Sequence, residues 1–346
     1  MPTAPSVSIA LATHNGARFL DAQLQSLADQ TARPGELVVF EDASTDGTPS
    51  ILGAFAERAA FPVRLERGAE RRGYRAAFMA AAQACTGDLI AFCDQDDVWE
   101  PAKLERMTAP FGDPDVLLAH HDATLIDAEG RRLGPPLLTR RRGPWDVVPG
   151  FAQLFRRRLL AFAPLQPRSV DPLWAIAAAR DPASKAMAHD QFFLFWADAL
   201  GRAAHVPEAL VRYRQHPGAL FGRAPNPALF ALARAPELAA GKAEAADAQV
   251  ALLEAARPLC SPAELERLSS LLEARRATLP HLHGRAALYR REGLLGRACS
   301  LLKLAAAGAY GRGGLGPGLG DLAVDLAAAP RALASRKARS AGLSQA

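Results

Sequence analysis

The chain has 346 residues, of which 49% are hydrophobic and 22% are charged. This composition is typical of a globular protein and excludes collagen-like, purely coiled-coil and wholly disordered chains. The length predicts one large domain, or one domain with an appendage. The four cysteines have neither zinc-site nor disulfide-framework spacing, so we expect a reducing compartment.

The sequence contains no apolar segment long enough to predict a transmembrane helix, and its first residues do not resemble a secretory signal. We therefore expect a cytoplasmic protein. The 41 Lys and Arg residues against 36 Asp and Glu residues give a net charge of +5. This balance suits anionic partners such as nucleotide phosphates or the cytoplasmic membrane leaflet, and by itself it names none of them.

Short apolar runs alternate with helical patterns through about the first 130 residues. The expected strands cover residues 7–13, 37–40, 63–66 and 89–92, and the expected helices cover residues 19–30, 48–58 and 74–84. Strands that alternate with helices predict an α/β fold, with a mostly parallel sheet covered by helices on both faces.

Beyond this alternation, an Arg- and Pro-rich stretch and an aromatic helix are interpreted as an elaboration of the same domain, which we expect to span residues 1–235. The next segment is rich in Ala, Leu, Glu and Arg, and Ser261 with Glu264 has the form of a capping box. We expect a helical C-terminal appendage over residues 236–305 and a loosely ordered Gly- and Ala-rich tail over residues 306–346.

A strongly basic helix is expected within the appendage, over residues 285–304. Such a helix is most often a solvated face above an apolar stripe. The alternative is peripheral docking on anionic lipid at the cytoplasmic face of the membrane.

Polar residues follow three of the expected strands, in the segments Thr13 to Gly16, Glu41 to Gly47 and Asp94 to Asp97. Ligands of open parallel sheets bind at the carboxyl ends of the strands, so these segments predict one polar crevice. Singly, each has a structural reading as a turn or a helix cap. Three carboxylates within four residues repel one another unless a cation compensates them, and Asp-x-Asp suits Mg²⁺ or Mn²⁺.

Together these motifs resemble glycosyltransferase family 2, the inverting nucleotide-sugar-dependent enzymes with a GT-A fold. The segments from Val7 to Gly16 and from Leu37 to Gly47 are similar to the first two strands of the family and their turns. The segment from Phe92 to Trp99 resembles the Asp-x-Asp element of rhamnosyltransferase-like members. His189-Asp190 and the run from Val211 to His216 resemble the general-base and closing-loop elements.

The resemblance implies a donor site for a nucleoside-diphosphate sugar. Thr13, Asn15 and Asp42 would line the pocket for the base and ribose, and Asp94 would contact the ribose side. The family often has Asn-x-Gly after the third strand, whereas this chain has Arg72 before a glycine, so Arg72 is the candidate phosphate contact there.

The resemblance also implies the chemistry. Asp96 would hold the Mg²⁺ or Mn²⁺ ion that bridges the two phosphates, and His216 would support the metal or the pyrophosphate. Asp190 would take the proton of the acceptor hydroxyl, and this single displacement inverts the anomeric centre. The metal would neutralise charge on the departing nucleoside diphosphate.

The expected activity is transfer of a sugar, from dTDP-rhamnose or a UDP-sugar, to a hydroxyl of a glycan or lipid-linked acceptor in cell-surface polysaccharide assembly. The Gln-x-x-Arg-Trp element of processive synthases is not present, which favours single additions. A nucleotidyltransferase is one alternative, although it would need a Gly-rich basic loop after the first strand. A nucleic-acid-binding protein is the other, although carboxylates at three strand ends would repel phosphates, so no nucleic-acid partner is expected.

Overall fold

The computed structural model describes residues 5–141, 146–172, 185–217, 234–289 and 294–306, together with Asp325. The chain divides into two compact units. The first comprises Met1–Arg141, Val147–Pro164 and Ala188–Gly222, and the second comprises Arg142–Asp146, Leu165–Met187 and Arg223–Ala346. The tail expected over residues 306–346 lies outside the described residues, apart from its first residue and Asp325.

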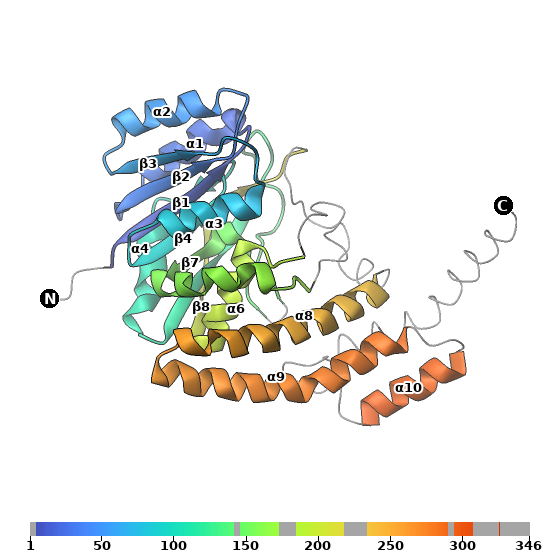
Figure 1. Cartoon of the computed structure of the whole chain (residues 1–346). Coiled ribbons are helices and arrows are strands. Elements are labelled where there is room, and N and C mark those ends of the chain that lie inside the picture. The colour runs from blue at the N-terminus through green and yellow to red at the C-terminus, as the bar shows by residue number, and fades with distance from the viewer. Residues whose placement is uncertain are drawn as a thin grey trace, which may run out of the picture. The chain divides into compact units, whose positions relative to one another are not determined.

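The described residues of the first unit form an eight-stranded sheet in the order β3-β2-β1-β4-β7-β6-β8-β5 (Figure 1). The strands are β1 (Val7–Thr13), β2 (Glu36–Glu41), β3 (Val63–Arg67), β4 (Leu89–Cys93), β5 (Val98–Trp99), β6 (Val116–Ile126), β7 (Gln153–Arg156) and β8 (Arg202–Arg214). Strands β1 to β4 pair in parallel, and β8 pairs in parallel with β6. Only β7 and β5, among the described strands, pair antiparallel to their neighbours, so the expected mostly parallel α/β sheet is confirmed.

The central strands are largely apolar because both faces of the sheet are covered. Every residue of β1, β2 and β4 is buried. Strand β3 lies at the edge of the sheet and is mostly exposed, and three of its five residues are charged. Charged side chains on an edge strand oppose pairing with another chain.

Helices of the first unit lie on both faces of the sheet. They are α1 (Ala17–Ala28), α2 (Thr48–Arg58), α3 (Tyr74–Ala84), α4 (Lys103–Thr108) and α6 (His189–Leu200), with short 3-10 helices η1 (Ala109–Gly112) and η2 (Gly150–Ala152). Figure 1 shows α3 and α6 in front of the sheet, and α3 packs against β1, β2 and α6. Another 3-10 helix, η3 (Arg157–Arg168), follows β7.

The strand directions place six carboxyl ends at one edge of the sheet. Strand β7 runs antiparallel to both β4 and β6, so β6 runs in the same direction as β4, and β8 follows β6. The segment after β8 therefore emerges at the same edge as the segments after β1, β2, β3 and β4. This topology brings His216, two residues beyond β8, toward the carboxylates that follow β4.

The second unit contains α8 (Ala235–Ala256), η4 (Arg257–Leu259), α9 (Pro262–Leu288) and α10 (Leu294–Ala306), which confirms the expected helical C-terminal region. The expected capping box begins α9, because Ser261 N donates to Glu264 Oε2 (2.7 Å) and Ser261 Oγ accepts from Glu264 N. Small residues let α8 and α9 approach closely, with Ala246 packed in a cluster that includes Leu282 and Ala286.

The basic helix expected over residues 285–304 is not one solvated helix. Arg285 lies in the last turn of α9 and is 2% exposed, and Arg297 of α10 is 1% exposed. Arg285 forms two hydrogen bonds to Asp325, at 2.6 and 2.9 Å, so this cation is a buried ion-pair partner. Two of the arginines behind the lipid-docking expectation are therefore not available to a membrane surface.

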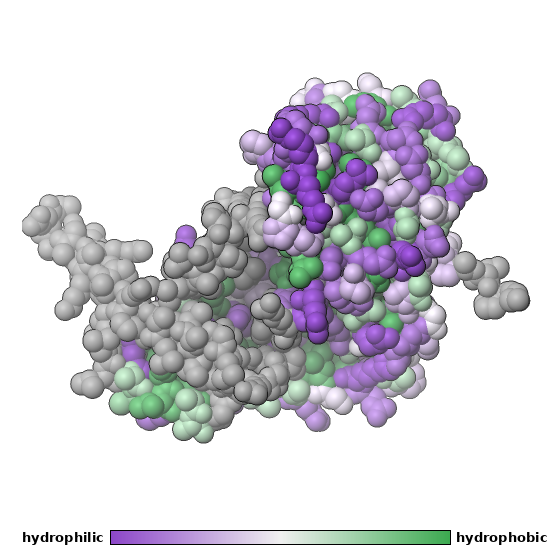
Figure 2. All heavy atoms as spheres, turned by 180° about the vertical axis from the view of Figure 1, so that it is seen from behind, coloured by the Kyte–Doolittle hydropathy of each residue, from purple (hydrophilic) through white to green (hydrophobic). Residues whose placement is uncertain are grey.

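None of the helices in the described ranges combines the length and apolarity needed to cross a bilayer. On the face seen in Figure 2, hydrophilic side chains dominate the coloured surface, and hydrophobic ones are scattered among them.

Candidate functional site

Asp42 follows β2 and is held by backbone groups. Its Oδ1 accepts from Arg72 N (2.7 Å) and its Oδ2 accepts from Gly73 N (2.8 Å). Gly73 has a φ of 85°, a left-handed conformation that glycine adopts without strain. Asp42 N donates to the carbonyl of Thr13 at the end of β1 (2.8 Å). Asp42 therefore joins the turns after β1, β2 and β3.

Asn15 connects the same turns from the β1 side. Its Oδ1 accepts from Thr45 N and its backbone N donates to Ser44 Oγ, both at 2.9 Å. Asn15 and Ala43 have left-handed backbone conformations, with φ of 48° and 55°. Residues other than glycine adopt this conformation only where the surroundings hold them there, which is common at functional sites.

Asp46 caps two helices with one carboxylate. Its Oδ1 accepts from Thr48 N (3.0 Å) at the start of α2, and its Oδ2 accepts from Ala17 N (3.1 Å) at the start of α1. Burial acts to raise the pKa of Asp46, but the hydrogen bonds from Thr48 and Ala17 lower it overall.

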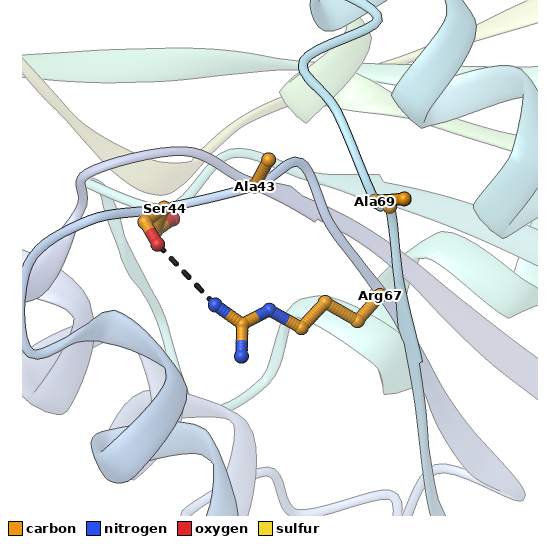
Figure 3. A pocket seen from close by; sticks show the side chains of 5 residues that line it. Ala43, Ser44, Arg67 and Ala69 are labelled. Atoms are coloured by element: carbon orange, nitrogen blue, oxygen red, sulfur yellow. Dashed lines mark hydrogen bonds between the residues drawn. The ribbon is translucent and has the colours of Figure 1, made fainter.

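A pocket of about 390 Å³ opens beside these turns, past the ends of β2 and β3 (Figure 3). It is lined by Ala43, Ser44, Arg67, Gly68 and Ala69. The Arg67 side chain extends toward Ser44 and donates to its carbonyl at 3.4 Å, while its Nε pairs with Glu41 at 2.9 Å. Arg67 was not predicted from the sequence, although the rule that ligands bind at strand ends applies equally to β3.

Several predicted donor-site residues lie close to this pocket in the chain without lining it. Thr13 is buried, and its hydroxyl has no hydrogen-bond partner among the described residues. Arg72 is exposed, and its backbone N donates to Asp42. Its guanidinium carbon lies over the Phe40 ring, 5.3 Å from the ring centre.

The carboxylates that follow β4 lie against the residues that follow β8. Asp96 Oδ2 is 2.8 Å from His216 Nε2, although the two residues are 120 positions apart in the chain. The ring of Phe19 in α1 lies 4.8 Å from the His216 ring, centre to centre, and supports it from one side. The structure thus brings together the two residues that the sequence predicted as metal ligands.

The neighbouring carboxylates carry more negative charge than their surroundings balance. Burial, together with the charges of Asp96 and Asp190, raises the pKa of Asp94 to about 7. Burial and the charges of Asp96 and Asp94 also raise the pKa of Asp97. Asp97 Oδ1 accepts from Arg214 N (2.9 Å), whereas its Oδ2 is buried with no hydrogen-bond partner among the described residues.

Lys103 lies beneath this acidic segment and is only 1% exposed. Its Nζ donates to the carbonyl of Phe151 (2.7 Å) and lies 3.5 Å from the ring centre of Trp99. Burial lowers the pKa of Lys103 to about 7, against the opposing effect of Asp97 and other negative groups nearby. The sequence analysis missed this lysine because no pattern around it signals burial.

Asp190 is the second residue of α6, and its charge acts on Asp94. Its carbonyl accepts from Gln153 Nε2 (3.1 Å) at the start of β7. The preceding His189 is packed between Phe78 and Phe92, with ring centres 4.0 and 4.5 Å away. These contacts fix the first turn of α6 and place Asp190 at the same sheet edge as the acidic segment.

The residues at this edge fit a divalent cation that keeps most of its ligands from water and substrate. Among the described residues, no three His, Cys, Asp or Glu side chains form a ready-made metal cage. Mg²⁺ and similar ions are commonly held by one or two protein carboxylates and by substrate phosphates. Asp96 and His216 offer one oxygen and one nitrogen, and Asp97 adds a buried oxygen that has no hydrogen-bond partner among the described residues.

Part of the chain that forms this site matches a known protein family. The family model described as glycosyl transferase family 2 matches residues 8–161, which include Asp42, Asp94 and Asp96. Residues 8–161 are therefore similar to glycosyltransferase family 2. His216 and Asp190 follow the matched segment in the chain and join it through the sheet topology.

The chain is also similar to two bacterial proteins. An uncharacterized glycosyltransferase of Nostoc sp. is 28% identical over 224 residues, which cover 61% of this chain and 65% of that protein. The putative glycosyltransferase EpsH of Bacillus subtilis is 27% identical over 226 residues, which cover 63% of each chain. The chain therefore spans just under two thirds of the length of either relative.

Among solved structures, the S. aureus protein TarS in complex with UDP-GlcNAc is similar, with a TM-score of 0.50 and 17% sequence identity. The similarity covers 89% of this chain and 93% of that one. It supports a shared fold, and together with the sheet order it confirms the expected GT-A architecture.

Proposed function

We propose that the chain is an inverting glycosyltransferase that moves a sugar from a nucleoside-diphosphate donor to a hydroxyl of a glycan or lipid-linked acceptor in cell-surface polysaccharide assembly. The observation that carries this proposal is the 2.8 Å contact between Asp96 and His216. It joins two distant parts of the chain at the ligand-binding edge of a domain that is similar to glycosyltransferase family 2.

The donor nucleotide is proposed to enter the pocket past β2 and β3. Asp42 and Asn15 fix the turns that border it, and Arg67 and Ser44 line it. Arg67 offers hydrogen-bond donors to the carbonyl oxygens of uracil or thymine, which suits a UDP-sugar or dTDP-rhamnose. Arg72 is exposed beside Asp42 and is the proposed phosphate contact.

Asp96 and His216 are proposed to hold Mg²⁺ or Mn²⁺. When bound, the metal supplies Lewis-acid stabilisation of the charge that develops on the departing diphosphate. Burial and mutual repulsion raise the pKa of Asp94 and of Asp97 behind the pair, so a bound cation would stabilise their ionised forms, which favours a cation over an anion at this position.

Asp190 is proposed as the general base. Its carboxylate takes the proton of the acceptor hydroxyl as the acceptor oxygen forms a bond to the anomeric carbon. The bond from that carbon to the phosphate oxygen breaks on the opposite face, and the nucleoside diphosphate leaves. The fixed first turn of α6 holds Asp190 for this single displacement, which inverts the anomeric centre.

Calorimetry tests the proposal with UDP, dTDP and GDP, each with Mn²⁺ and with chelator, on the native protein and on Asp96→Ala. We expect one nucleotide to bind in a Mn²⁺-dependent manner, and we expect Asp96→Ala to abolish that dependence. Asp113→Ala is the matched control, because it removes an exposed carboxylate that pairs with Arg202 and accepts from the backbone N of Asp115, away from Asp96.

Failure of all three nucleotides to bind the folded native protein would contradict the proposal. Mn²⁺-dependent binding that survives in Asp96→Ala would place the metal elsewhere. Incorporation of a nucleotide into an acceptor, with release of pyrophosphate, would instead favour a nucleotidyltransferase.

A further inference from the structure

Arg214, the last residue of β8, connects three segments at the site edge and is 6% exposed. Its Nε donates to the carbonyl of Asp96 (2.8 Å), and its backbone N donates to Asp97 Oδ1 (2.9 Å). Its guanidinium also reaches the turn after β6, where one terminal nitrogen donates to the carbonyls of Asp127 (3.2 Å) and Ala128 (3.0 Å). One guanidinium therefore fixes two turns from different strands.

An aromatic ring supports Arg214 on one side. The guanidinium carbon lies 4.8 Å from the centre of the Phe19 ring, a distance typical of a cation–π contact. His216 lies against the same ring, also at 4.8 Å. Phe19 of α1 is thus a common platform for the two residues of the β8 end that contact Asp96.

Asp96 is consequently held at two points. Arg214 bonds its backbone carbonyl, and His216 bonds its carboxylate. The backbone contact sets where the Asp96 α-carbon lies, and the His216 contact sets how its side chain is turned. Groups that orient a metal ligand in this way commonly change metal affinity strongly when they are removed.

We propose that Arg214 is a positioning residue that holds Asp96 where its carboxylate binds the divalent cation of the donor complex. The inference rests on the proposed function, in which Asp96 is a metal ligand. Arg214 touches neither the proposed acceptor base nor the nucleotide pocket through any of these contacts, so it acts through Asp96.

Arginine suits this position better than lysine does. Its planar group presents five N–H donors in a fixed arrangement, so it can serve the carbonyls of both turns at once. A lysine ammonium is a compact charge on a flexible stem, and it would reach one turn at a time. Arg214→Lys should therefore keep the charge and part of the function.

The test is a Mn²⁺ titration of nucleotide binding to the full chain, with the nucleotide that the native protein binds. We expect Arg214→Gln to raise the half-saturating Mn²⁺ concentration by about 10- to 100-fold, and Arg214→Lys to raise it by a smaller factor. Arg212→Gln is the matched control on the same strand, because Arg212 is exposed and pairs with Glu100 at 3.1 Å. Its titration should match the native one within about twofold.

The shape of the titration separates positioning from a purely structural role. A displaced Asp96 requires more Mn²⁺ but reaches native nucleotide affinity at saturation, whereas partial unfolding lowers the number of binding sites at every Mn²⁺ concentration. If Arg214→Gln does not fold, as judged by thermal melting, Arg214→Lys carries the comparison alone.

If folded Arg214→Gln has the same Mn²⁺ midpoint as the native protein, the proposed role of Arg214 is overturned and the proposed function is left intact. The same holds for Arg214→Lys if Arg214→Gln does not fold. A reduced number of sites with an unchanged midpoint would also overturn the proposed role. Absence of Mn²⁺-dependent binding in the native protein would overturn the proposed function, and the inference about Arg214 with it.

Discussion

The carboxylates on the two sides of the site edge have opposite environments. On the β2 side, which we define by Asp42 and Asp46, the carboxylate oxygens accept backbone N–H groups of the turns around them. On the β4 side, defined by Asp94, Asp96 and Asp97, burial and mutual repulsion raise the pKa of Asp94 to about 7 and raise that of Asp97.

This difference shows that residue type alone does not tell a structural carboxylate from a ligand-binding one. The β2 side is electrostatically complete, since its oxygens already have donors from the chain. The β4 side gains stability from any cation that enters it. The β2 side is therefore expected to shape a pocket, and the β4 side is expected to bind metal.

The largest expected effect belongs to Asp190, whose charge acts on the β4 side. Asp190→Asn removes the proposed base, so we expect kcat to fall by about 10²- to 10⁴-fold with a nearly unchanged KM for the donor. Steady-state transfer assays measure both constants. Asp198→Asn, at the other end of α6, removes an ion pair with Arg141 and serves as the control. Full kcat in Asp190→Asn would remove this residue from the mechanism.

On the β2 side, Asp42→Asn should destabilise the fold. The amide places a donor where the carboxylate accepts from Arg72 N or Gly73 N. We expect the free energy of unfolding in urea to fall by about 1 to 3 kcal/mol, the usual cost of losing hydrogen bonds to a charged group. An unchanged urea midpoint would contradict the description of this side as complete.

The same substitution on the β4 side should have the opposite sign. Asp97→Asn keeps an acceptor for Arg214 N and replaces a buried carboxyl of raised pKa with a neutral amide. In chelator, we expect the free energy of unfolding to rise by about 1 kcal/mol, because a buried repulsion is relieved. If the free energy of unfolding instead falls as much as in Asp42→Asn, the proposed difference between the two sides is contradicted.

A pH dependence of stability is also expected on the β4 side. Because the pKa of Asp94 is raised from 3.8 to about 7 in the folded chain, its stabilising contribution is fully present below about pH 4 and is lost as the pH rises through 7. In chelator, native Tm should therefore fall by a few degrees relative to Asp94→Asn between pH 5 and pH 8. Parallel melting curves across that range would contradict a raised pKa at Asp94.

Local signals made much of the first unit predictable. The expected helix boundaries of α2 and α3 match the observed ones, because Pro49 in the first turn of α2 and Gly73 before α3 mark the starts. The strands β1, β2 and β4 were visible as apolar runs because both faces are buried. The pairing of Asp96 with His216 also follows from strand direction once β8 is placed.

Other features depend on contacts between distant residues, which single positions do not encode. Arg214 and Lys103 look like ordinary surface cations in the sequence, yet both are buried at the site. The basic pattern that includes Arg285 and Arg297 predicted a solvated helix. Both side chains are instead buried, and Arg285 pairs with Asp325. The antiparallel insertion of β7 between β4 and β6 likewise has no local signature.

Gly16 leaves no space for a side chain at the site edge. A β-carbon at this position would overlap Gln95 Oε1, the atom that accepts from His14 N. Gln95 Nε2 also donates to the His14 carbonyl, so this one amide braces the β1 turn against the β4 segment. An engineer who wants to broaden donor choice should keep positions 16 and 95 fixed and randomise positions 67 to 69. The residues that line the nucleotide pocket would then vary while the proposed metal site stays unchanged.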